Sequence, residues 1–270
     1  RSGNDAAVAL AEYIAGSKEE FAKLMNNKAH ELGLKNTNFV TPHGLDDPKH
    51  YTTAYELAQI ADYALKNDKF AQIVKTQYAT ININGYSKEL KNTNELLLGN
   101  IEGVYGVKTG FTNNAGRCLV TAVKRKNMDL IIVVLGADTR KDRAKDSLKL
   151  INYIYQNYRV ENIEEQIQKQ FDLWNEINKN RIYIYKGTKS IELELGKIKY
   201  EKIITNKQIT IEINSLNYLE APVEKGTVIG NLIVKNGGEI VETIDIKTAH
   251  EIRRKGIFDY LEMFAKIITQ

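Results

Sequence analysis

The sequence of 270 residues is short of the residues that build disulfide frameworks, metal sites and nucleic-acid surfaces. It has one cysteine, Cys118, and four histidines, which excludes an internal disulfide framework and argues against a cysteine/histidine metal site. The net charge is only +4 and basic residues alternate with acidic ones, so the concentrated charge that nucleic-acid binding needs is missing. No apolar run is long enough to span a bilayer. What remains is a globular protein with 43% hydrophobic residues, enough for a sizeable core, and no cofactor is expected.

The first part of the chain is rich in helical patterns. Two of the helices open on capping boxes, Ser17 with Glu20 and Thr53 with Glu56. The predicted helices are residues 5–15, 17–32 and 53–65. The segments VYGVKTGF, RCLVTAV and MDLIIVVLG then follow, separated by the short linkers NNAG and KRKN. This pattern predicts an antiparallel meander, and apolar residues at helical spacing up to Tyr158 predict a helix after it.

The pattern changes near residue 160. Short alternating segments (RIYIY, SIELEL, QITIEI) and a longer pair joined by NGG predict a separate all-β domain. From Ile257 onward, apolar residues recur on one helical face behind the basic cluster Arg253–Lys255. The predicted organisation is a first domain at 1–159, a β-rich domain at 160–252 and an amphipathic segment at 253–270.

Two short motifs are candidates for chemistry. In GVYGVKTGFT, β-branched residues favour a strand and three glycines leave space beside it, so Lys108 is predicted to be an anchored cation on an uncrowded strand. In RSGNDA, Ser2 and Asn4 lie at the start of a predicted helix, where both could simply act as N-caps.

Together these motifs resemble those of the penicillin-recognising serine enzymes, which carry Ser-x-x-Lys, Ser-Asp-Asn and Lys-Thr-Gly, with Ser-Gly-Asn in the second place here. The stretch LGLKNTNFVTPHGL and the trailing β domain make the chain similar to the low-molecular-mass D-alanyl-D-alanine carboxypeptidases of serine peptidase family S11. The resemblance covers essentially the whole chain. It implies an α+β fold, with helices packed on an antiparallel sheet in a penicillin-binding catalytic domain, followed by a small all-β domain.

The resemblance also implies roles for individual residues. Lys108, Thr109 and Gly110 would bind the terminal carboxylate of a peptidoglycan pentapeptide ending in D-Ala-D-Ala, while the peptide adds to the strand edge. The backbone N–H of Phe111 would be one of the two oxyanion donors. Ser2 would relay a proton to the leaving D-alanine, and Asn4 would contact the peptide amide.

Arg143 matches a family arginine near the carboxylate pocket, although a helix-surface salt bridge explains it equally well. The implied partners are the pentapeptide and β-lactam antibiotics. The implied location is extracytoplasmic, with the C-terminal helix lying on the outer face of the cell membrane, although its apolar face could instead dock on the β domain.

The family nucleophile is missing from these residues. The six serines are followed three positions later by Asp5, Glu20, Leu90, Leu150, Leu193 and Tyr218, so none begins a Ser-x-x-Lys motif. We expect this motif to precede Arg1, and the chain by itself to be catalytically inactive. Three alternatives remain: a binding protein without the nucleophile, a deamidating glutaminase, and a class A β-lactamase, for which Glu95 would be the poorly placed candidate base.

The first prediction is that the parent gene encodes a signal peptide and a Ser-x-x-Lys motif upstream of Arg1. Sequencing of the complete gene measures this directly. An upstream segment that lacks the motif would contradict the interpretation as an enzyme and would leave the interpretation as a binding protein without the nucleophile.

Overall fold

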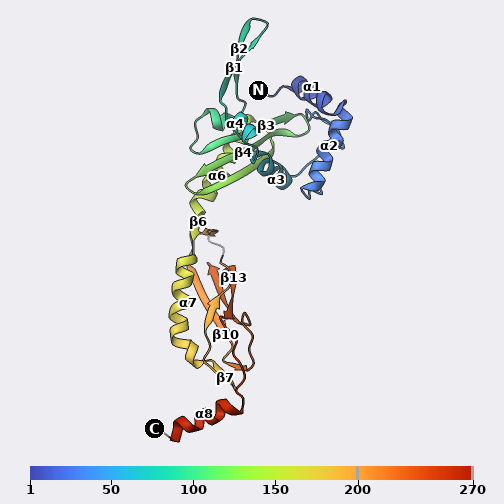
Figure 1. Cartoon of the computed structure of the whole chain (residues 1–270). Coiled ribbons are helices and arrows are strands. Elements are labelled where there is room, and N and C mark those ends of the chain that lie inside the picture. Colours follow the sequence, from blue (N-terminus) through green and yellow to red (C-terminus); the bar gives the residue numbers. More distant parts are fainter. Residues whose placement is uncertain (199–200, 269–270) are drawn as a thin grey trace. The chain divides into compact units, whose positions relative to one another are not determined.

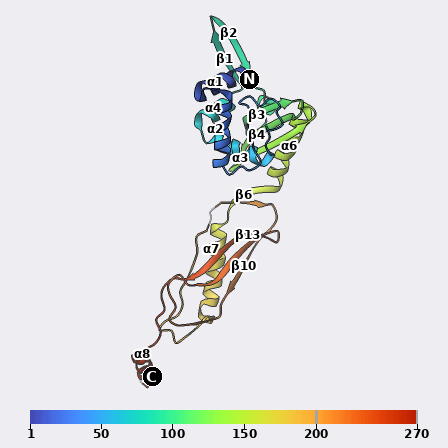
Figure 2. The ribbon, with the colours of Figure 1, turned by 90° about the vertical axis from the view of Figure 1, so that its right-hand side faces the viewer.

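The computed structural model describes residues 1–198 and 201–268. The chain forms two compact units, Arg1–Gln156 and Asn157–Gln270 (Figures 1 and 2). Within the predicted segments 160–252 and 253–270, residues 199–200 and 269–270 lie outside the described residues. Each unit has a hydrophobic core of its own.

An antiparallel sheet of three strands forms the centre of the first unit. Its strands β3 (Val104–Thr112), β4 (Gly116–Arg125) and β5 (Met128–Ala137) lie in the order β3-β4-β5. The predicted meander is therefore confirmed. Because β4 is central, β3 forms one edge of this sheet.

Helices cover both faces of the sheet. The helices of the first unit are α1 (Asn4–Ala15), α2 (Lys18–Glu31), α3 (Ala54–Leu65), α4 (Asp68–Val74), α5 (Glu95–Leu98) and α6 (Arg140–Asn157). Alternate side chains of β4 enter two different layers, as the period of a strand requires. Leu119 and Val123 pack with residues of α5 and α6, whereas Val120 and Ala122 pack with residues of α3 and α4. The unit is thus the predicted α+β arrangement of helices on an antiparallel sheet.

A hairpin of two strands precedes α5. It consists of β1 (Tyr78–Ile83) and β2 (Tyr86–Lys91) and projects from the first unit (Figure 1). The chain leaves β2 and enters α5 through Asn92, Thr93 and Asn94. This short connection brings three polar residues to the side of β3.

The second unit is built mainly from short strands. Its four-stranded sheet has the order β10-β12-β13-β8, and the two pairs β6 with β9 and β7 with β11 accompany it. The strands are β6 (Tyr158–Asn162), β7 (Tyr183–Tyr185), β8 (Leu193–Leu195), β9 (Glu201–Thr205), β10 (Ile209–Ser215), β11 (Tyr218–Glu220), β12 (Val228–Asn236) and β13 (Glu239–Thr248). β12 and β13 form the hairpin predicted at NGG, where Gly237 and Gly238 both have positive φ.

Two helices complete the second unit. Helix α7 (Glu164–Asn178) was not predicted; it buries Ile167 and Phe171 in the core of this unit and is followed by a 3₁₀ turn at Lys179–Arg181. Helix α8 (Ile257–Ile268) confirms the predicted C-terminal helix, and none of its twelve residues is buried. Within the described part of the chain, no helix combines the length and the apolar character needed to cross a membrane.

The two predicted capping boxes form only in one direction. Ser17 accepts a hydrogen bond from the Glu20 backbone N–H, and Thr53 accepts one from that of Glu56. Each glutamate side chain, however, bonds elsewhere, because Glu20 pairs with Lys23 and Glu56 reaches residues 35–37. The caps stabilise the starts of the helices, while the Glu56 side chain makes tertiary contacts with residues 35–37.

The Glu56 carboxylate anchors the loop that follows α2. Its side chain accepts hydrogen bonds from the backbone N–H groups of Lys35 and Asn36 and from the Thr37 hydroxyl, and the residue is only 6% exposed. Burial by itself raises the pKa of Glu56, but the hydrogen bonds from Thr37, Asn36 and Lys35 outweigh it and lower the pKa below the ordinary value of a glutamate. The ionised carboxylate is therefore the form that holds this loop on α3.

We expect Glu56→Gln to lower the thermal unfolding midpoint at neutral pH, because the carboxylate stabilises the fold above its unfolded pKa. That contribution is lost as the pH falls through the lower folded-state pKa. The midpoint gap between wild type and Glu56→Gln, followed by circular dichroism, should therefore shrink from pH 7 to pH 3. Glu12→Gln, at an exposed position of α1, serves as the matched control. An equal difference in unfolding midpoint at both pH values would show that the charge of Glu56 does not cause the stabilisation.

Candidate active site

Lys108 lies on the open edge of the three-stranded sheet. It is paired with Val120 of β4, and among the described residues β3 has a strand neighbour only on the β4 side. The buried side chain of Asn94 donates a hydrogen bond of 2.9 Å to the Gly106 backbone oxygen, which fixes the strand two residues before Lys108. An edge of this kind can accept an extended peptide as an additional strand.

The structure brings Ser2 to Lys108. The Lys108 ammonium donates a hydrogen bond of 3.1 Å to the Ser2 hydroxyl, across 106 positions of sequence. It also donates to the backbone oxygen of Thr109. Helix α1 starts at Asn4 with Gly3 as its N-cap, and no side chain caps this end, so the N-cap explanation of Ser2 and Asn4 is wrong. The exposed Asn4 begins the helix, and its contact with the peptide amide stays a prediction.

The environment of Lys108 disfavours its charge. Loss of water around the ammonium lowers the pKa of Lys108, and the positive charge of Arg143 lowers it further. Within the described chain, the two hydrogen-bond acceptors of the ammonium, the Ser2 hydroxyl and the Thr109 backbone oxygen, are both neutral. A ligand carboxylate would compensate this charge, so the site is suited to an anion.

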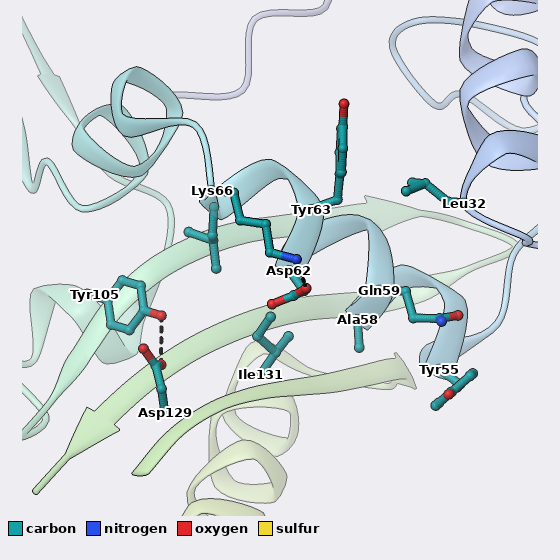
Figure 3. A pocket seen from close by; sticks show the side chains of 11 residues that line it. Leu32, Tyr55, Ala58, Gln59, Asp62, Tyr63, Lys66, Tyr105, Asp129 and Ile131 are labelled. Carbon is teal, nitrogen blue, oxygen red and sulfur yellow. Dashed lines mark hydrogen bonds and ion pairs between the residues drawn. The ribbon is translucent and has the colours of Figure 1, made fainter. Parts of the chain in front are cut away.

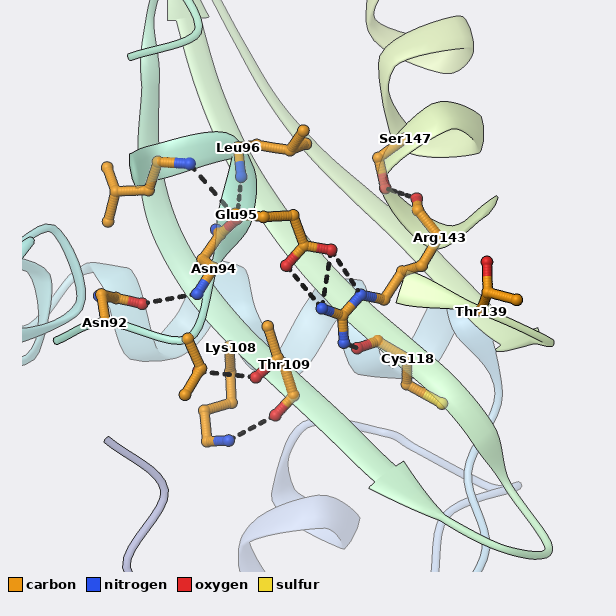
Figure 4. Close-up of polar contacts among 12 residues, drawn as sticks. Asn92, Asn94, Glu95, Leu96, Lys108, Thr109, Cys118, Thr139, Arg143 and Ser147 are labelled. Carbon is orange, nitrogen blue, oxygen red and sulfur yellow. Dashed lines mark hydrogen bonds and ion pairs between the residues drawn. The ribbon is translucent and has the colours of Figure 1, made fainter. Parts of the chain in front are cut away.

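The residues after Lys108 differ in exposure. Thr109 is 8% exposed, and its hydroxyl donates a hydrogen bond of 2.7 Å to the Thr93 hydroxyl (Figure 4). A Cβ atom on Gly110 would lie 3.6 Å from the Cβ of Cys118, an ordinary contact. Phe111 is half exposed and is covered by the Arg117 guanidinium. The substrate roles of Thr109, Gly110 and Phe111 stay predictions.

The guanidinium of Arg143 is occupied by another residue. Arg143 is 3% exposed; its Nε and Nη2 donate to the Glu95 carboxylate, and its Nη1 donates to the backbone oxygen of Cys118 (Figure 4). The salt bridge expected for Arg143 thus exists, but it joins α6 to α5, with the arginine side chain buried and the Glu95 side chain partly exposed. Direct binding of substrate by Arg143 stays a prediction, whereas Glu95 is too firmly paired to act as the free base of a β-lactamase.

Sequence reasoning missed the residues that support β3 from the side. Thr93 contacts Thr109, Asn94 contacts Gly106, and Glu95 pairs with Arg143. Asn94 also caps α5, since its side chain accepts from the backbone N–H groups of Leu96 and Leu97. The polar run Asn-Thr-Asn-Glu before three leucines is a typical N-cap signal and could have placed a helix start here.

A hollow of about 680 Å³ lies elsewhere in the first unit (Figure 3). It lies beside α3 and the strands β3 and β5, and its wall contains the Asp62–Lys66 ion pair and the hydrogen bond from Tyr105 to Asp129. Burial and this hydrogen bond raise the pKa of Tyr105. Neither Ser2 nor Lys108 lines the hollow, so it is distinct from the candidate site.

Comparisons with known proteins agree with these motifs. A family model described as D-alanyl-D-alanine carboxypeptidase matches residues 1–139, and one described as the C-terminal domain of penicillin-binding protein 5 matches residues 202–254. The D-alanyl-D-alanine carboxypeptidase DacF of Bacillus subtilis is 33% identical over 97% of this chain and 66% of its own length. The D-alanyl-D-alanine carboxypeptidase DacA of Haemophilus influenzae is 35% identical over 96% of this chain and 64% of its own length.

The fold comparison leads to the same family. The crystal structure of penicillin binding protein 5 from Haemophilus influenzae matches with a TM-score of 0.63 and 31% identity, over 94% of this chain and 72% of that chain. The chain spans just under two thirds of the length of the two curated relatives. With both motifs in contact on one sheet edge, and with these matches in both units, the chain belongs to the D-alanyl-D-alanine carboxypeptidase family.

Proposed function

We propose that the protein is a serine-type D-alanyl-D-alanine carboxypeptidase, which removes the terminal D-alanine from peptidoglycan stem peptides and is acylated by β-lactams. The observation that carries this proposal is the contact of 3.1 Å between Lys108 and Ser2 on the open edge of β3. Family membership supports the same conclusion. A protein that acts on peptidoglycan works outside the cytoplasm.

The reaction places the peptide along β3. The substrate backbone adds to this edge as a strand, and Lys108 attracts the terminal carboxylate by charge. A serine of the family motif, which residues 1–270 do not contain, attacks the penultimate carbonyl and forms an ester as D-alanine leaves. The Phe111 N–H stabilises the oxyanion, Ser2 passes a proton to the leaving amine, and Asn4 holds the peptide amide. Hydrolysis of the ester then completes the cycle.

Arg143 acts on this site at a distance. Loss of water is the main cause that lowers the pKa of Lys108, and the charge of Arg143 adds to it while the Arg143 donors are held by Glu95 and Cys118. We therefore assign to Arg143 an electrostatic contribution to carboxylate binding. Direct contact with the substrate is not needed for this role.

We expect Lys108→Ala, in the protein expressed from its complete gene, to reduce kcat/KM for D-alanine release and for penicillin acylation by roughly 10- to 100-fold. This is the range for loss of a hydrogen bond to a charged group. Lys108→Arg should restore only part of the rate, because its planar fork does not fit the place of a compact ammonium. Lys145→Ala, at an exposed position of α6, is the control. Acylation of Lys108→Ala at the wild-type rate would show that the assignment is wrong.

The C-terminal helix is proposed to attach the second unit to the outer face of the membrane. Ile257, Leu261 and Phe264 of α8 are all more than half exposed, and the basic segment Arg253–Lys255 precedes them. An apolar helical face next to basic residues suits an interface with anionic lipid. Because the described residues of α8 are not buried on the second unit, this helix has an apolar surface to offer.

We expect the double variant Leu261→Ser with Phe264→Ser to sediment less with vesicles that contain anionic lipid, because burial of the apolar face is lost. Binding of wild type should also weaken as salt rises, since the basic segment is screened. Tyr86→Ser, which removes a residue that is 80% exposed in the other unit, is the matched control. Equal sedimentation of wild type and the double variant at low salt would reject the attachment.

A further inference from the structure

Three tyrosines gather on one face of the short parallel strands β7 and β11 in the second unit. The register places Tyr183 opposite Tyr218. Because side chains alternate along a strand, Tyr183 and Tyr185 lie on the same side of β7. The ring centroid of Tyr218 lies 6.0 Å from that of Tyr183 and 6.4 Å from that of Tyr185. These three residues are called the tyrosine face below.

The tyrosine face is turned away from the core. Ile184 and Leu219, which alternate with the tyrosines on the same two strands, pack against the hydrophobic core of the second unit. The tyrosine rings are instead exposed: Tyr183 by 60%, Tyr185 by 37% and Tyr218 by 53%. Within the described residues, none of their three hydroxyls has a hydrogen-bond partner. The face therefore leaves ring area in water that the fold of the unit does not cover.

The tyrosine face lies close to the start of the C-terminal helix. Strand β7 is at the end of the second unit from which α8 leaves (Figure 1). The backbone N–H of Lys255 donates a hydrogen bond of 2.7 Å to the backbone oxygen of Lys186, the residue that follows β7. Only Gly256 separates Lys255 from α8. The same end of the unit thus carries both the tyrosine face and the exposed apolar helix.

Basic side chains accompany the tyrosine face. The Lys186 ammonium lies 4.6 Å from the ring centroid of Tyr185, and Arg254 lies 3.8 Å from the carboxylate of Glu220 in β11. The cations at this end outnumber the carboxylates that pair with them: Lys186, Arg253, Arg254 and Lys255 against Glu220 and Asp259. The positive charge that remains favours a partner with negative charge.

Exposed tyrosines beside cations fit the interface of an anionic bilayer. Tyrosine is enriched at membrane surfaces, where its ring lies at the level of the headgroups and its hydroxyl stays hydrated. Anionic headgroups attract basic residues that come within a Debye length. The twelve residues of α8 form a helix of only about 18 Å, which gives modest binding. A second contact on the same unit would raise the affinity through its high effective concentration.

We propose that the tyrosine face is a second membrane contact, which places its rings among the headgroups of an anionic bilayer when α8 binds there. This assignment rests on the proposed attachment through α8 and adds a contact made by the folded body of the second unit. A helix alone would leave that body free to swing above the surface. Two contacts at one end hold it in a single orientation.

The test measures sedimentation with vesicles of phosphatidylcholine alone or mixed with phosphatidylglycerol, for the protein expressed from its complete gene. The double variant Tyr183→Thr with Tyr218→Thr removes two rings and keeps residues that favour strands. Its matched control is Tyr78→Thr with Tyr86→Thr, two strand tyrosines of the first unit that are 50% and 80% exposed. Thermal unfolding checks that every variant folds.

We expect Tyr183→Thr with Tyr218→Thr to lower the partition onto anionic vesicles by roughly 10-fold, because the apolar area of two rings stays in water. The control variant should bind as wild type does. Lys186→Gln should weaken binding to anionic vesicles by roughly fivefold, the effect of one basic residue near such a surface. On vesicles of phosphatidylcholine alone, Lys186→Gln should change little.

A second measurement reports where the ring lies. The fluorescence of Tyr218→Trp should shift to shorter wavelength when anionic vesicles are added, because the indole leaves water. Tyr86→Trp, in the other unit, should show no such shift. Emission of Tyr218→Trp that is unchanged while the protein is bound would show that the tyrosine face stays in water.

The possible failures can be told apart. Unchanged partition of Tyr183→Thr with Tyr218→Thr, together with loss of binding by Leu261→Ser with Phe264→Ser, would reject the tyrosine face and keep the attachment through α8. Absence of wild-type binding to anionic vesicles would reject both contacts. A double variant that loses binding to purified peptidoglycan but not to vesicles would show that the face binds glycan instead. Penicillin acylation of wild type tests the enzyme independently of all these results.

Discussion

A guanidinium that has lost its water must be paired, and Arg143 imposes this requirement on the whole site. Its partner Glu95 is the first residue of α5, so the ion pair fixes the start of that helix against α6. The two residues before Glu95 then have little freedom, and they are the ones that contact Gly106 and Thr109. The edge of the sheet, the position of Lys108 and the side-chain contact of Thr109 all depend on this one buried charge. Removal of one partner of such a pair is costly, because the other charge is left buried.

The sequence predicted the elements that local patterns control. The three strands of the sheet that carries Lys108 are predictable because their side chains alternate between two apolar layers. The starts of α2 and α3 are predictable from the capping residues Ser17 and Thr53. The proximity of Ser2 and Lys108 came from the family resemblance, because no local rule joins residues so far apart. Helix α7 was not predicted, although Ile167, Phe171 and Trp174 recur at helical spacing, because it lies in a region where strand-like segments prevail.

What could not be predicted from sequence lies in contacts between distant elements. Glu56 was recognised as part of a capping box, but its side chain holds the loop at residues 35–37, about 20 positions earlier. The sequence offers Glu95 as a candidate base and Arg143 as a candidate substrate ligand, yet across 48 positions the two side chains pair with each other. Such pairings are decided by burial, because a charged group that leaves water takes whichever partner the fold brings near.

The contact between Ser2 and Lys108 also has a consequence for the folding of the chain. Closing a loop of 106 positions costs conformational entropy that one hydrogen bond in solvent cannot offset. The contact is therefore stable only when the helices and strands between the two residues have already packed. Any ligand that needs both side chains will bind molecules that have finished folding and ignore those that have not. Its bound fraction would thus count native molecules in a preparation, independently of the total amount of protein.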